Sequence, residues 1–514
     1  MLQNEYLSTP IYKKIIVIIV SLIILAMQVA IFYFSFIGSI YNEKYTYTRI
    51  LYFVGLILGF IVCLLVINFE KNASYKVTWI ALISLLPLFF SFLYMLNFFA
   101  RRFPKRKQSR LLDYVDTNNL VKYNDYSELT SEERRISKMI YSQGRETIYN
   151  NTKVEFFNDA SLKHKHMIET LKKAKKYIFL EYFIISDGQL MDELIEVLNE
   201  KGNEGVEIKF LYDDMGSKRC LSKKLISKLV SIPNLKLCVF QPLGFNLNPL
   251  LNYRDHRKIV VVDGLYAYCG GDNLADEYIH LKQRFGYWRD NACYYEGEAV
   301  DGFISMFSTM WFMSSKETLD LRNYIVKHNV VNDTYVIPIS DGPNNNENIA
   351  YNAFASMFNV ANETLYISTP YLIIDDNLLE DIINAKKSGV DVKILTPGIP
   401  DKKMVFSVTR AHYKTLLEAG VEVYEYTKGF NHAKNIIVDN KMAFCGTVNM
   451  DYRSMFLHYE CGGIIFRDKV IHEMKEDFLK DIKESKLVTI DDYKKRNIFS
   501  KLSAFLLRVF SPML

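Results

Sequence analysis

The sequence contains no CxxC pair of cysteines, no P-loop and no dinucleotide-binding fingerprint. Its seven cysteines are an odd number, and Cys269 and Cys445 lie within apolar runs. This distribution indicates buried, reduced thiols in a reducing compartment and argues against a disulfide framework or a cysteine-based zinc site. The missing phosphate-binding loops argue against a nucleotide cofactor. We therefore expect chemistry that uses no cofactor.

A strong excess of charge of one sign is also missing. The net charge is +5 and 24% of the residues are charged, which is too mild a balance to indicate a nucleic-acid-binding protein. Apolar residues are abundant instead, at 49%, with 14% aromatic residues, and the excess lies before Arg101. A chain of 514 residues is long enough for two or three folded cores.

Three long apolar runs occupy residues 15–40, 50–67 and 77–100. Each is close to or above the roughly 20 residues that a helix needs to cross a bilayer. The alternatives are buried core helices or, for the first run, a cleaved signal peptide, but that run is too long for one and lacks a small-x-small cleavage site. Residues 1–110 are therefore predicted to be a membrane domain with two or three transmembrane helices.

The basic segment RRFPKRKQSR, from Arg101 to Arg110, follows the third apolar run. It holds six lysines and arginines, against Lys13 and Lys14 before the first run. Because positive charge is retained on the cytoplasmic side of a membrane, the sequence predicts a multi-pass cell-membrane protein whose remaining chain is cytoplasmic. The segment is also expected to attract anionic membrane lipids.

One motif occurs twice beyond the membrane domain, in NYRDHRKIVVVDGLYAYCGGDN and in NHAKNIIVDNKMAFCGTVN. In both segments, counted from the histidine, a lysine stands at position +2, an aspartate at +7 and an asparagine at +17. The first copy consists of His256, Lys258, Asp263 and Asn273, and the second of His432, Lys434, Asp439 and Asn449. A single copy could be a core histidine beside a lysine that extends to water, but matched offsets in two copies argue against that.

The surroundings of the two motifs repeat as well. Residues 174–214 parallel residues 362–401, and each segment has the pattern of a strand, a helix, a Gly-Val turn and a second strand. These units predict an α/β layered fold, duplicated as a first half at 151–330 and a second half at 331–485. Two such halves packed about a pseudo-twofold axis would bring both motifs into one site.

The remaining segments flank these halves. The polar segment 111–150, which has a helical patch around Ser131 to Tyr141, is expected to be a linker that lies along the membrane. The tail, 486–514, is expected to form an amphipathic helix at the membrane surface, and a helix packed on the protein core is the alternative. Its apolar face would consist of Ile498, Phe499, Leu502, Phe505, Leu506, Val509 and Phe510.

Two facing copies of the motif would make a site for an oxyanion such as phosphate. The histidines can act as nucleophile and as general acid or base near neutral pH. The lysines supply positive charge, and the asparagines supply amide donors. Charged lysine is not a metal ligand, and its charge replaces the cations of other phosphoryl-transfer sites, so the motif implies no metal.

The two motifs resemble the HKD signature of the phospholipase D superfamily, and their surroundings are similar to bacterial cardiolipin synthases. The segments that carry this resemblance are NYRDHRKIVVVDG, GGDNLADEY, YWRD, TPYLIIDD, GFNHAKNIIVD and GTVNMDYRS. It implies a duplicated phospholipase D-like α/β/α sandwich preceded by transmembrane helices. The chain departs from the pattern twice. The superfamily often has serine where this chain has Gly271 and Thr447, and the family usually has two transmembrane helices.

The resemblance also implies roles for the site residues. His256 would attack phosphorus and form a phosphohistidine, whereas His432 would protonate the leaving glycerol and later deprotonate the incoming hydroxyl. The phosphate oxygens would be held by Lys258, Lys434, Asn273 and Asn449.

Four carboxylates complete the candidate site. Glu460 and Asp290 occupy the family positions of the groups that orient the histidines, although Asp290 could pair with a nearby arginine instead. Asp263 and Asp439 belong to the motif and are counted with its catalytic residues, but their places after apolar strands indicate a structural role.

The reaction implied by the resemblance transfers a phosphatidyl group from one phosphatidylglycerol to another, releasing glycerol and forming cardiolipin. The alternatives are hydrolysis of the phospholipase D type and transfer to another alcohol. A nuclease of the superfamily and a non-enzymatic membrane scaffold fit the apolar runs and the intact motifs less well. The expected partners are phosphatidylglycerol and anionic membrane lipids rather than nucleic acid, and the oligomeric state is left open.

Overall fold

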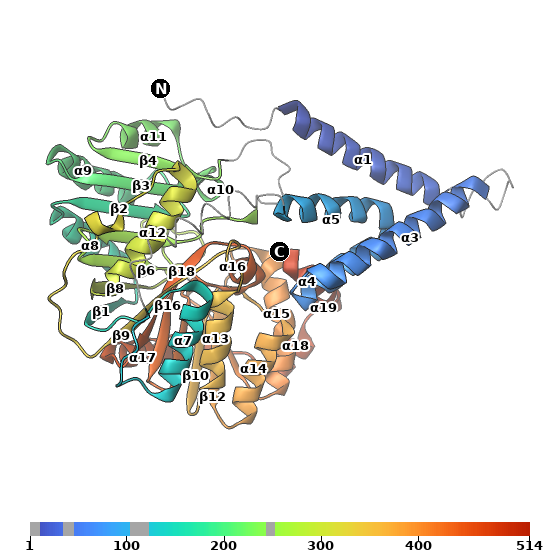
Figure 1. The fold of residues 1–514 in the computed structure, drawn as a ribbon. Helices are drawn as coiled ribbons and strands as arrows, with labels where there is room; N and C mark the ends of the chain where they lie inside the picture. Colours follow the sequence, from blue (N-terminus) through green and yellow to red (C-terminus); the bar gives the residue numbers. More distant parts are fainter. Residues whose placement is uncertain (1–10, 34–45, 103–122, 243–251, 514) are drawn as a thin grey trace. The chain divides into compact units, whose positions relative to one another are not determined.

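The computed structural model describes residues 11–33, 46–102, 123–242 and 252–513 (Figure 1). The chain divides into two compact units, which are described separately. The helical unit comprises Met1–Ser109, Leu243–Asn252 and Leu506–Leu514, and the α/β unit comprises Arg110–Pro242 and Tyr253–Phe505.

In its described residues, the helical unit contains four apolar helices near the N-terminus. They are α1 (Ile11–Tyr33), α3 (Thr46–Phe69), α4 (Ala73–Leu85) and α5 (Pro87–Arg102). Among the described residues, one helical stretch, Arg49–Phe69, is long and apolar enough to cross a membrane.

The third apolar run does not form the single membrane-spanning helix that the sequence predicts. Leu86 ends α4 with φ −136° and ψ 80°, and Pro87 begins α5. Proline lacks the backbone N–H that a continuing helix requires, and its ring disfavours helical geometry at the preceding residue. The run therefore forms helices of 13 and 16 residues, each shorter than the roughly 20 residues of a full span.

The C-terminal tail forms the helix α19 (Ile498–Val509) and a 3₁₀ turn (Ser511–Met513). Within the helical unit, the Thr78 hydroxyl donates a hydrogen bond of 2.6 Å to the Val509 carbonyl. Met513 packs against the same core as α3, α4 and α5. The end of the chain is thus anchored on the N-terminal helices.

Part of the apolar face that the sequence predicts for the tail is described. Its exposed members are Leu502, Leu506, Val509 and Phe510. The side chains of Ile498, Phe499 and Phe505 lie outside the described residues. An exposed apolar stripe on a helix is the pattern of an interfacial helix, which therefore stays a prediction for this tail.

The α/β unit contains two large sheets. The strands of the first sheet are β1 (Thr152–Phe157), β2 (Tyr177–Tyr182), β3 (Glu207–Asp213), β4 (Leu235–Phe240), β5 (Lys258–Val262), β6 (Tyr266–Gly270) and β8 (Ala292–Gly297). Those of the second are β9 (Tyr335–Asp341), β10 (Thr364–Ser368), β12 (Asp391–Pro397), β13 (Glu422–Tyr426), β15 (Asn435–Val438), β16 (Met442–Gly446), β18 (Glu460–Phe466) and β19 (Ser485–Leu487).

The two sheets have the same strand order. The first sheet has the order β1-β8-β6-β5-β2-β3-β4, and the second has the order β9-β18-β16-β15-β10-β12-β13 with β19 added at the edge. In both, the strand that follows the motif histidine (β5 or β15) lies at the centre, antiparallel to β2 or β10. The residues of β5 and β15 are all buried, as expected for apolar strands covered on both faces.

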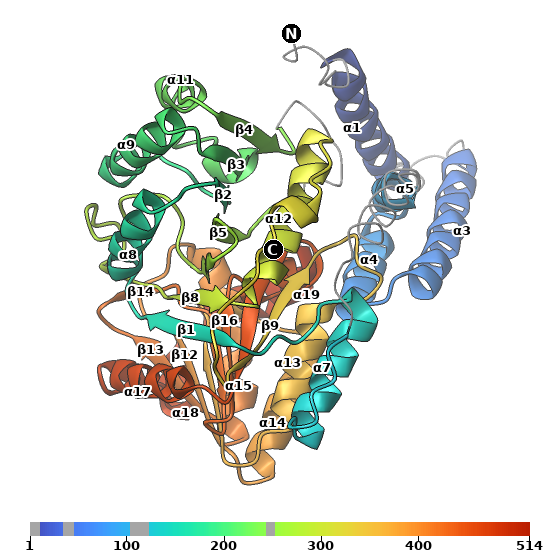
Figure 2. The same ribbon diagram turned by 60° about the vertical axis from the view of Figure 1, so that its left-hand side comes forward.

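Helices cover both sheets, and one helical layer is shared between them (Figure 2). Helices α8 (Ala160–Lys172), α9 (Gln189–Asn203) and α11 (Lys223–Val230) pack in a core with the outer face of the first sheet. Helices α13 (Ile349–Asn359), α14 (Asp376–Lys387) and α15 (Lys403–Glu418) do the same for the second. Between the sheets, α12 (Val300–Ser315) and α17 (Lys469–Lys483) share a third core with strands of both. The predicted duplicated α/β/α sandwich is confirmed.

The segment 111–150 contains a helix where the sequence predicts a helical patch, around Ser131 to Tyr141. Its described part contains α7 (Ser131–Gly144), which lies beside α13 (Figure 1). Ile136, Ile140 and Ile148 are fully buried in the core of the second half. Because Ile136 and Ile140 are four residues apart, they share one face of the helix. In the sequence, this short apolar stripe is hard to recognise because its neighbours are charged. Residues 111–122 lie outside the described part of the chain.

Candidate functional site

The two motif histidines lie at the starts of the central strands. His256 precedes β5, and His432 lies between the short strand β14 (Gly429–Asn431) and β15. Both side chains are about nine-tenths buried, with 10% and 9% of their surface exposed. Each motif histidine thus lies at one end of a buried apolar strand, where polar side chains lie close together.

Backbone pairing joins each histidine to the other half of the chain. The N–H of His256 donates to the Tyr459 carbonyl over 2.9 Å, beside a bridge between Asp255 and Tyr459. The N–H of His432 donates to the Arg289 carbonyl over 2.7 Å, where β14 pairs with β7 (Tyr287–Arg289). The two contacts are equivalent, because each places a histidine beside the residue that precedes a buried carboxylate of the opposite half.

Those carboxylates hold the histidine rings. Nδ1 of His256 lies 2.9 Å from Oε1 and 3.0 Å from Oε2 of Glu460. Nδ1 of His432 lies 2.6 Å from Oδ2 of Asp290. Both carboxylates are fully buried. The alternative partner for Asp290, an arginine, is not used, because the neighbouring Arg289 pairs with Asp477 and Asp481.

Burial keeps both histidines neutral by lowering their pKa values. Burial lowers the pKa of His256 to about 3, against the opposing charge of Glu460. Burial lowers the pKa of His432 well below its usual value, and the charges of Lys434 and Lys258 lower it further. A neutral imidazole that donates its Nδ1 proton to a carboxylate carries a lone pair on Nε2. Each ring is therefore oriented as a nucleophile or base.

The two lysines are the positive charges of the site. Nζ of Lys258 donates to the His256 carbonyl, and Nζ of Lys434 donates to the His432 carbonyl. Burial lowers the pKa of Lys434 to about 7, with Asp290 opposing this shift and Lys258 adding to it. Asp290 and Lys258 belong to the first half and shift the pKa of Lys434 in the second half. The two motifs therefore form one electrostatic site, and such a site favours an anion.

The two asparagines are both buried but differ in their contacts. Asn273 accepts a hydrogen bond of 2.9 Å from the Ile184 N–H and donates one of 2.7 Å to the Tyr278 hydroxyl. Among the residues that the structure describes, Oδ1 of Asn449 has no hydrogen-bond partner. The Tyr278 ring packs 5.8 Å from the His432 ring, measured between centroids. Tyr278 ends the segment GGDNLADEY that carries the family resemblance, but sequence reasoning gave this tyrosine no role.

The departures at Gly271 and Thr447 have a structural reason. The Thr447 hydroxyl donates to Oε2 of Glu460. A Cβ atom at Gly271 would lie only 2.1 Å from Oδ1 of Asp290, so the shorter acid requires glycine there. The two halves are consequently unequal, since only Glu460 receives support from a hydroxyl at this position.

The motif aspartates lie away from the histidines, at the opposite ends of β5 and β15. Asp263 accepts hydrogen bonds from the backbone N–H groups of Lys175, Lys176 and Tyr177 at 2.7–2.9 Å. Asp439 accepts equivalent bonds from Asn362, Glu363 and Thr364 at 2.7–2.8 Å. Each aspartate thus closes the turn that leads into the neighbouring strand, which is the structural role expected from its place after an apolar strand.

We predict that Asp263→Ala lowers stability with little direct effect on chemistry. Hydrogen bonds to a charged acceptor contribute about 1.5–3 kcal/mol each, and three are lost together, so we expect destabilisation of about 3 kcal/mol or more. The melting temperature of the detergent-purified protein should fall by several degrees, whereas Glu380→Ala on an exposed position of α14 should leave it unchanged. A normal melting temperature with lost activity would instead place Asp263 in the chemistry.

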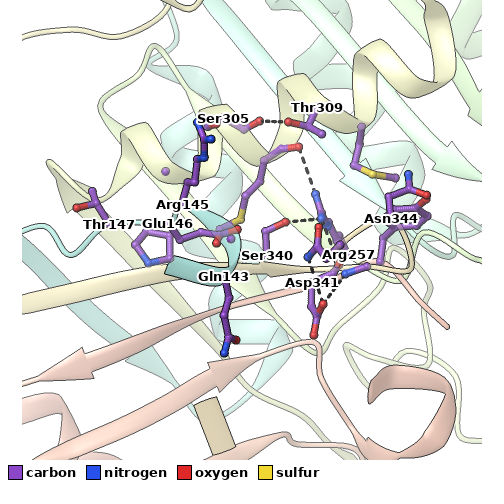
Figure 3. Close-up of a pocket in the computed structure, with 18 of the residues that line it drawn as sticks. Gln143, Arg145, Glu146, Thr147, Arg257, Ser305, Thr309, Ser340, Asp341 and Asn344 are labelled. Carbon is purple, nitrogen blue, oxygen red and sulfur yellow. Dashed lines mark hydrogen bonds between the residues drawn. The ribbon is translucent and has the colours of Figure 1, made fainter. Parts of the chain in front are cut away.

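Arg257 stabilises the backbone next to the site through hydrogen bonds. It lies between His256 and Lys258 in the sequence, and its side chain lines a cavity of about 450 Å³ whose lining includes neither histidine (Figure 3). Its Nε donates to the Glu460 carbonyl over 3.2 Å, and Nη2 donates to the Ser340 hydroxyl over 2.6 Å. This arginine therefore braces the backbone that carries Glu460, a role that the sequence did not reveal.

Comparisons with known proteins agree with this arrangement. Residues 354–482 match a family model described as "Cardiolipin synthase, PLD-like domain". Cardiolipin synthase 2 of Bacillus anthracis is 32% identical over 455 residues, which cover 87% of this chain and 88% of the relative. The chain belongs to the cardiolipin synthase family of the phospholipase D superfamily. Cardiolipin synthase of Alkalihalophilus pseudofirmus is also 32% identical, over 88% of this chain and 91% of the relative.

Two further similarities concern a relative of unknown function and a solved fold. An uncharacterised protein of Streptococcus mutans is 40% identical over 74% of this chain and 82% of its own length. The crystal structure of phosphatidylserine synthase from Haemophilus influenzae superposes with a TM-score of 0.58 at 15% identity, covering 74% of this chain and all of that one. At this identity the superposition shows the fold, which is the two-sheet architecture described above.

Proposed function

We propose that this protein is a cardiolipin synthase that transfers a phosphatidyl group between two phosphatidylglycerol molecules through a phosphohistidine. The observation that carries the proposal is the pair of neutral histidines, each bonded to a buried carboxylate of the opposite half. Two rings with free Nε2 atoms and two buried lysines are suited to exchange one phosphodiester for another. The choice of phosphatidylglycerol as substrate rests on the relatives named cardiolipin synthase, which match most of the chain.

In the first step, Nε2 of His256 forms a bond to phosphorus, and the bond from phosphorus to the glycerol oxygen breaks. The imidazole becomes positively charged, and the adjacent Glu460 carboxylate stabilises that charge. His432 delivers a proton to the glycerol oxygen. When the phosphodiester anion binds, it offsets the positive charges of Lys258 and Lys434. This raises the pKa of His432, so that His432 can carry the proton.

In the second step, His432 removes the proton from a hydroxyl of another phosphatidylglycerol. That oxygen bonds to phosphorus, and the bond between phosphorus and Nε2 of His256 breaks. The product is cardiolipin, and both histidines return to their starting state. Lys258, Lys434, Asn273 and Asn449 are proposed to hold the phosphate oxygens throughout.

The contrast between the two carboxylates supports the choice of His256 as nucleophile. Burial raises the pKa of Glu460, but its hydrogen bond with His256 lowers it, and the pKa of Glu460 lies well below its usual value. Burial raises the pKa of Asp290 to about 6, although Lys434 lowers it. A permanently ionised partner stabilises the phosphorylated ring better, so the nucleophile is assigned to the Glu460 side.

Activity is expected to survive chelation. The lysines take the place of metal ions in stabilising the phosphate, so treatment with excess EDTA should leave the rate of cardiolipin formation unchanged. A loss of activity with EDTA that is restored by added Mg²⁺ would contradict this account of the site.

The membrane placement is also proposed. The helix Arg49–Phe69 and the basic segment after α5 support a membrane protein whose α/β unit faces the cytoplasm. A protease added outside intact cells should leave the chain beyond about residue 110 uncut, whereas permeabilised cells should show cleavage there. Cleavage of this part in intact cells would overturn the topology.

Incubation of the detergent-purified protein with labelled phosphatidylglycerol tests the reaction. The expected products are cardiolipin and glycerol in equal amounts, identified by mass. Phosphatidic acid as the sole lipid product would favour hydrolysis instead, and preferential formation of another phosphatidyl ester when alcohols compete would favour a different acceptor.

A further inference from the structure

A third histidine, His458, lies beside the proposed nucleophile and has no role in the steps above. Its side chain is about nine-tenths buried, and its Nδ1 atom is buried with no hydrogen-bond partner in the described part of the chain. That nitrogen lies 3.6 Å from Oε1 of Glu460, beyond hydrogen-bonding distance. The rings of His458 and His256 are 5.4 Å apart between centroids. A buried, unpaired nitrogen aimed at a carboxylate needs an explanation.

The three side chains together have the geometry of a metal site. One ligand atom from each of His256, His458 and Glu460 lies within 4.8 Å of the other two. Oε1 of Glu460 is 2.9 Å from Nδ1 of His256 and 3.6 Å from Nδ1 of His458. In a tetrahedral zinc site, bonds of about 2.0–2.1 Å hold the ligand atoms about 3.3 Å apart. The two observed distances bracket that value.

The chemistry of the donors points to the same ion. Two imidazole nitrogens and one carboxylate oxygen are a donor set typical of Zn²⁺, with a fourth position left open. The Glu460 carboxylate lies beside both rings. The nearby positive charge of Lys258, which also acts on His256, weakens cation binding. We therefore expect a reversible site rather than a permanently occupied one.

We propose that His256, His458 and Glu460 form an inhibitory zinc site. The inhibition follows from the proposed function, because Zn²⁺ would bond to Nδ1 of His256 in place of the proton shared with Glu460. A neutral imidazole bound through Nδ1 carries its proton on Nε2. The proton therefore moves from Nδ1 to Nε2, and the lone pair that attacks phosphorus is lost. No oxidation or reduction is involved, and removal of the ion restores the active tautomer.

The other half of the chain lacks the third ligand. The residue two positions before Asp290 is Trp288, and it corresponds to His458 two positions before Glu460. The Trp288 ring packs 5.5 Å from the His432 ring, almost the spacing of the His458 and His256 rings. Since an indole offers no metal ligand, the zinc site forms in one half only. Trp288 also shows that an aromatic ring without a ligand atom is accommodated at this position.

The test compares the full-length protein in detergent with His458→Phe and His458→Gln. Titration with Zn²⁺ is followed by calorimetry, and titration with Co²⁺ by the visible absorption of a tetrahedral complex. We expect one ion per chain for the unsubstituted protein and at least tenfold weaker binding in both variants. Equal binding in all three proteins, or no tetrahedral Co²⁺ spectrum in the unsubstituted protein, would overturn the site.

Turnover measurements test the inhibition separately. Zn²⁺ should suppress cardiolipin formation by the unsubstituted protein, EDTA should restore it, and both variants should keep metal-free activity while tolerating at least tenfold more Zn²⁺. Equal sensitivity of all three proteins would overturn the inhibitory role. If Zn²⁺ binds through His458 but no cardiolipin forms with or without the metal, the proposed function fails while the zinc site stands.

Discussion

His256→Gln and His432→Gln are each expected to reduce cardiolipin formation by at least about 10⁴-fold. Each removes a ring whose second nitrogen is already committed to a carboxylate, so no other described side chain is positioned to replace it. Because glutamine keeps a polar group of similar length, both variants should fold. Substantial turnover in either variant would contradict a mechanism that needs two histidines.

The two variants should differ when the donor lipid carries a leaving group of low pKa. Such a leaving group departs without a proton, so the general acid is no longer required for the first step. We expect release of the activated leaving group to recover in His432→Gln and to stay absent in His256→Gln. The reverse pattern would exchange the roles of the two histidines.

Glu460→Gln and Asp290→Asn are expected to lower the transfer rate by about 10³–10⁴-fold while leaving the fold intact. The carboxylates fix the tautomer that carries a proton on Nδ1, and an amide offers an N–H group that favours the opposite tautomer. Glu460→Gln also removes the negative charge that stabilises the phosphorylated ring. Rates of glycerol release and of cardiolipin formation, measured beside melting temperatures, would separate a catalytic loss from an unfolded protein.

The activated donor again separates the two sides. Glu460→Gln should remain slow with it, because the nucleophile itself is impaired. Asp290→Asn should recover in the first step, since only the acid side is affected. Equal recovery of both variants would show that the carboxylates do not divide their support between a nucleophile and an acid.

The sequence predicts the two motifs of this site but not the contacts between the two halves. Matched offsets identify His256 and His432, because a duplicated strand places the same residue types at the same positions. The pairing of each histidine with its carboxylate spans 204 residues for Glu460 and 142 for Asp290. Local spacing carries no information about contacts between halves, so those partners came from family resemblance, and His458 and Arg257 were not found.

The same limit explains the errors in the fold. The apolar run 77–100 has the composition of a single span, but the one residue Pro87 divides it. The segment containing α7 is polar on average, yet Ile136 and Ile140 are enough to bury one face. Composition averages over a segment, whereas helix continuity and packing depend on individual residues.

Detection of a covalent phosphatidyl-histidine tests the central claim most directly. With an activated donor lipid, His432→Gln should form the intermediate and then stall, because no base activates the incoming hydroxyl. Peptide mass spectrometry at alkaline pH, where phosphohistidine persists, should place the phosphatidyl group on His256, and His256→Gln should carry none. Cardiolipin formation without any adduct, or an adduct on His432 in the unsubstituted protein, would contradict the account.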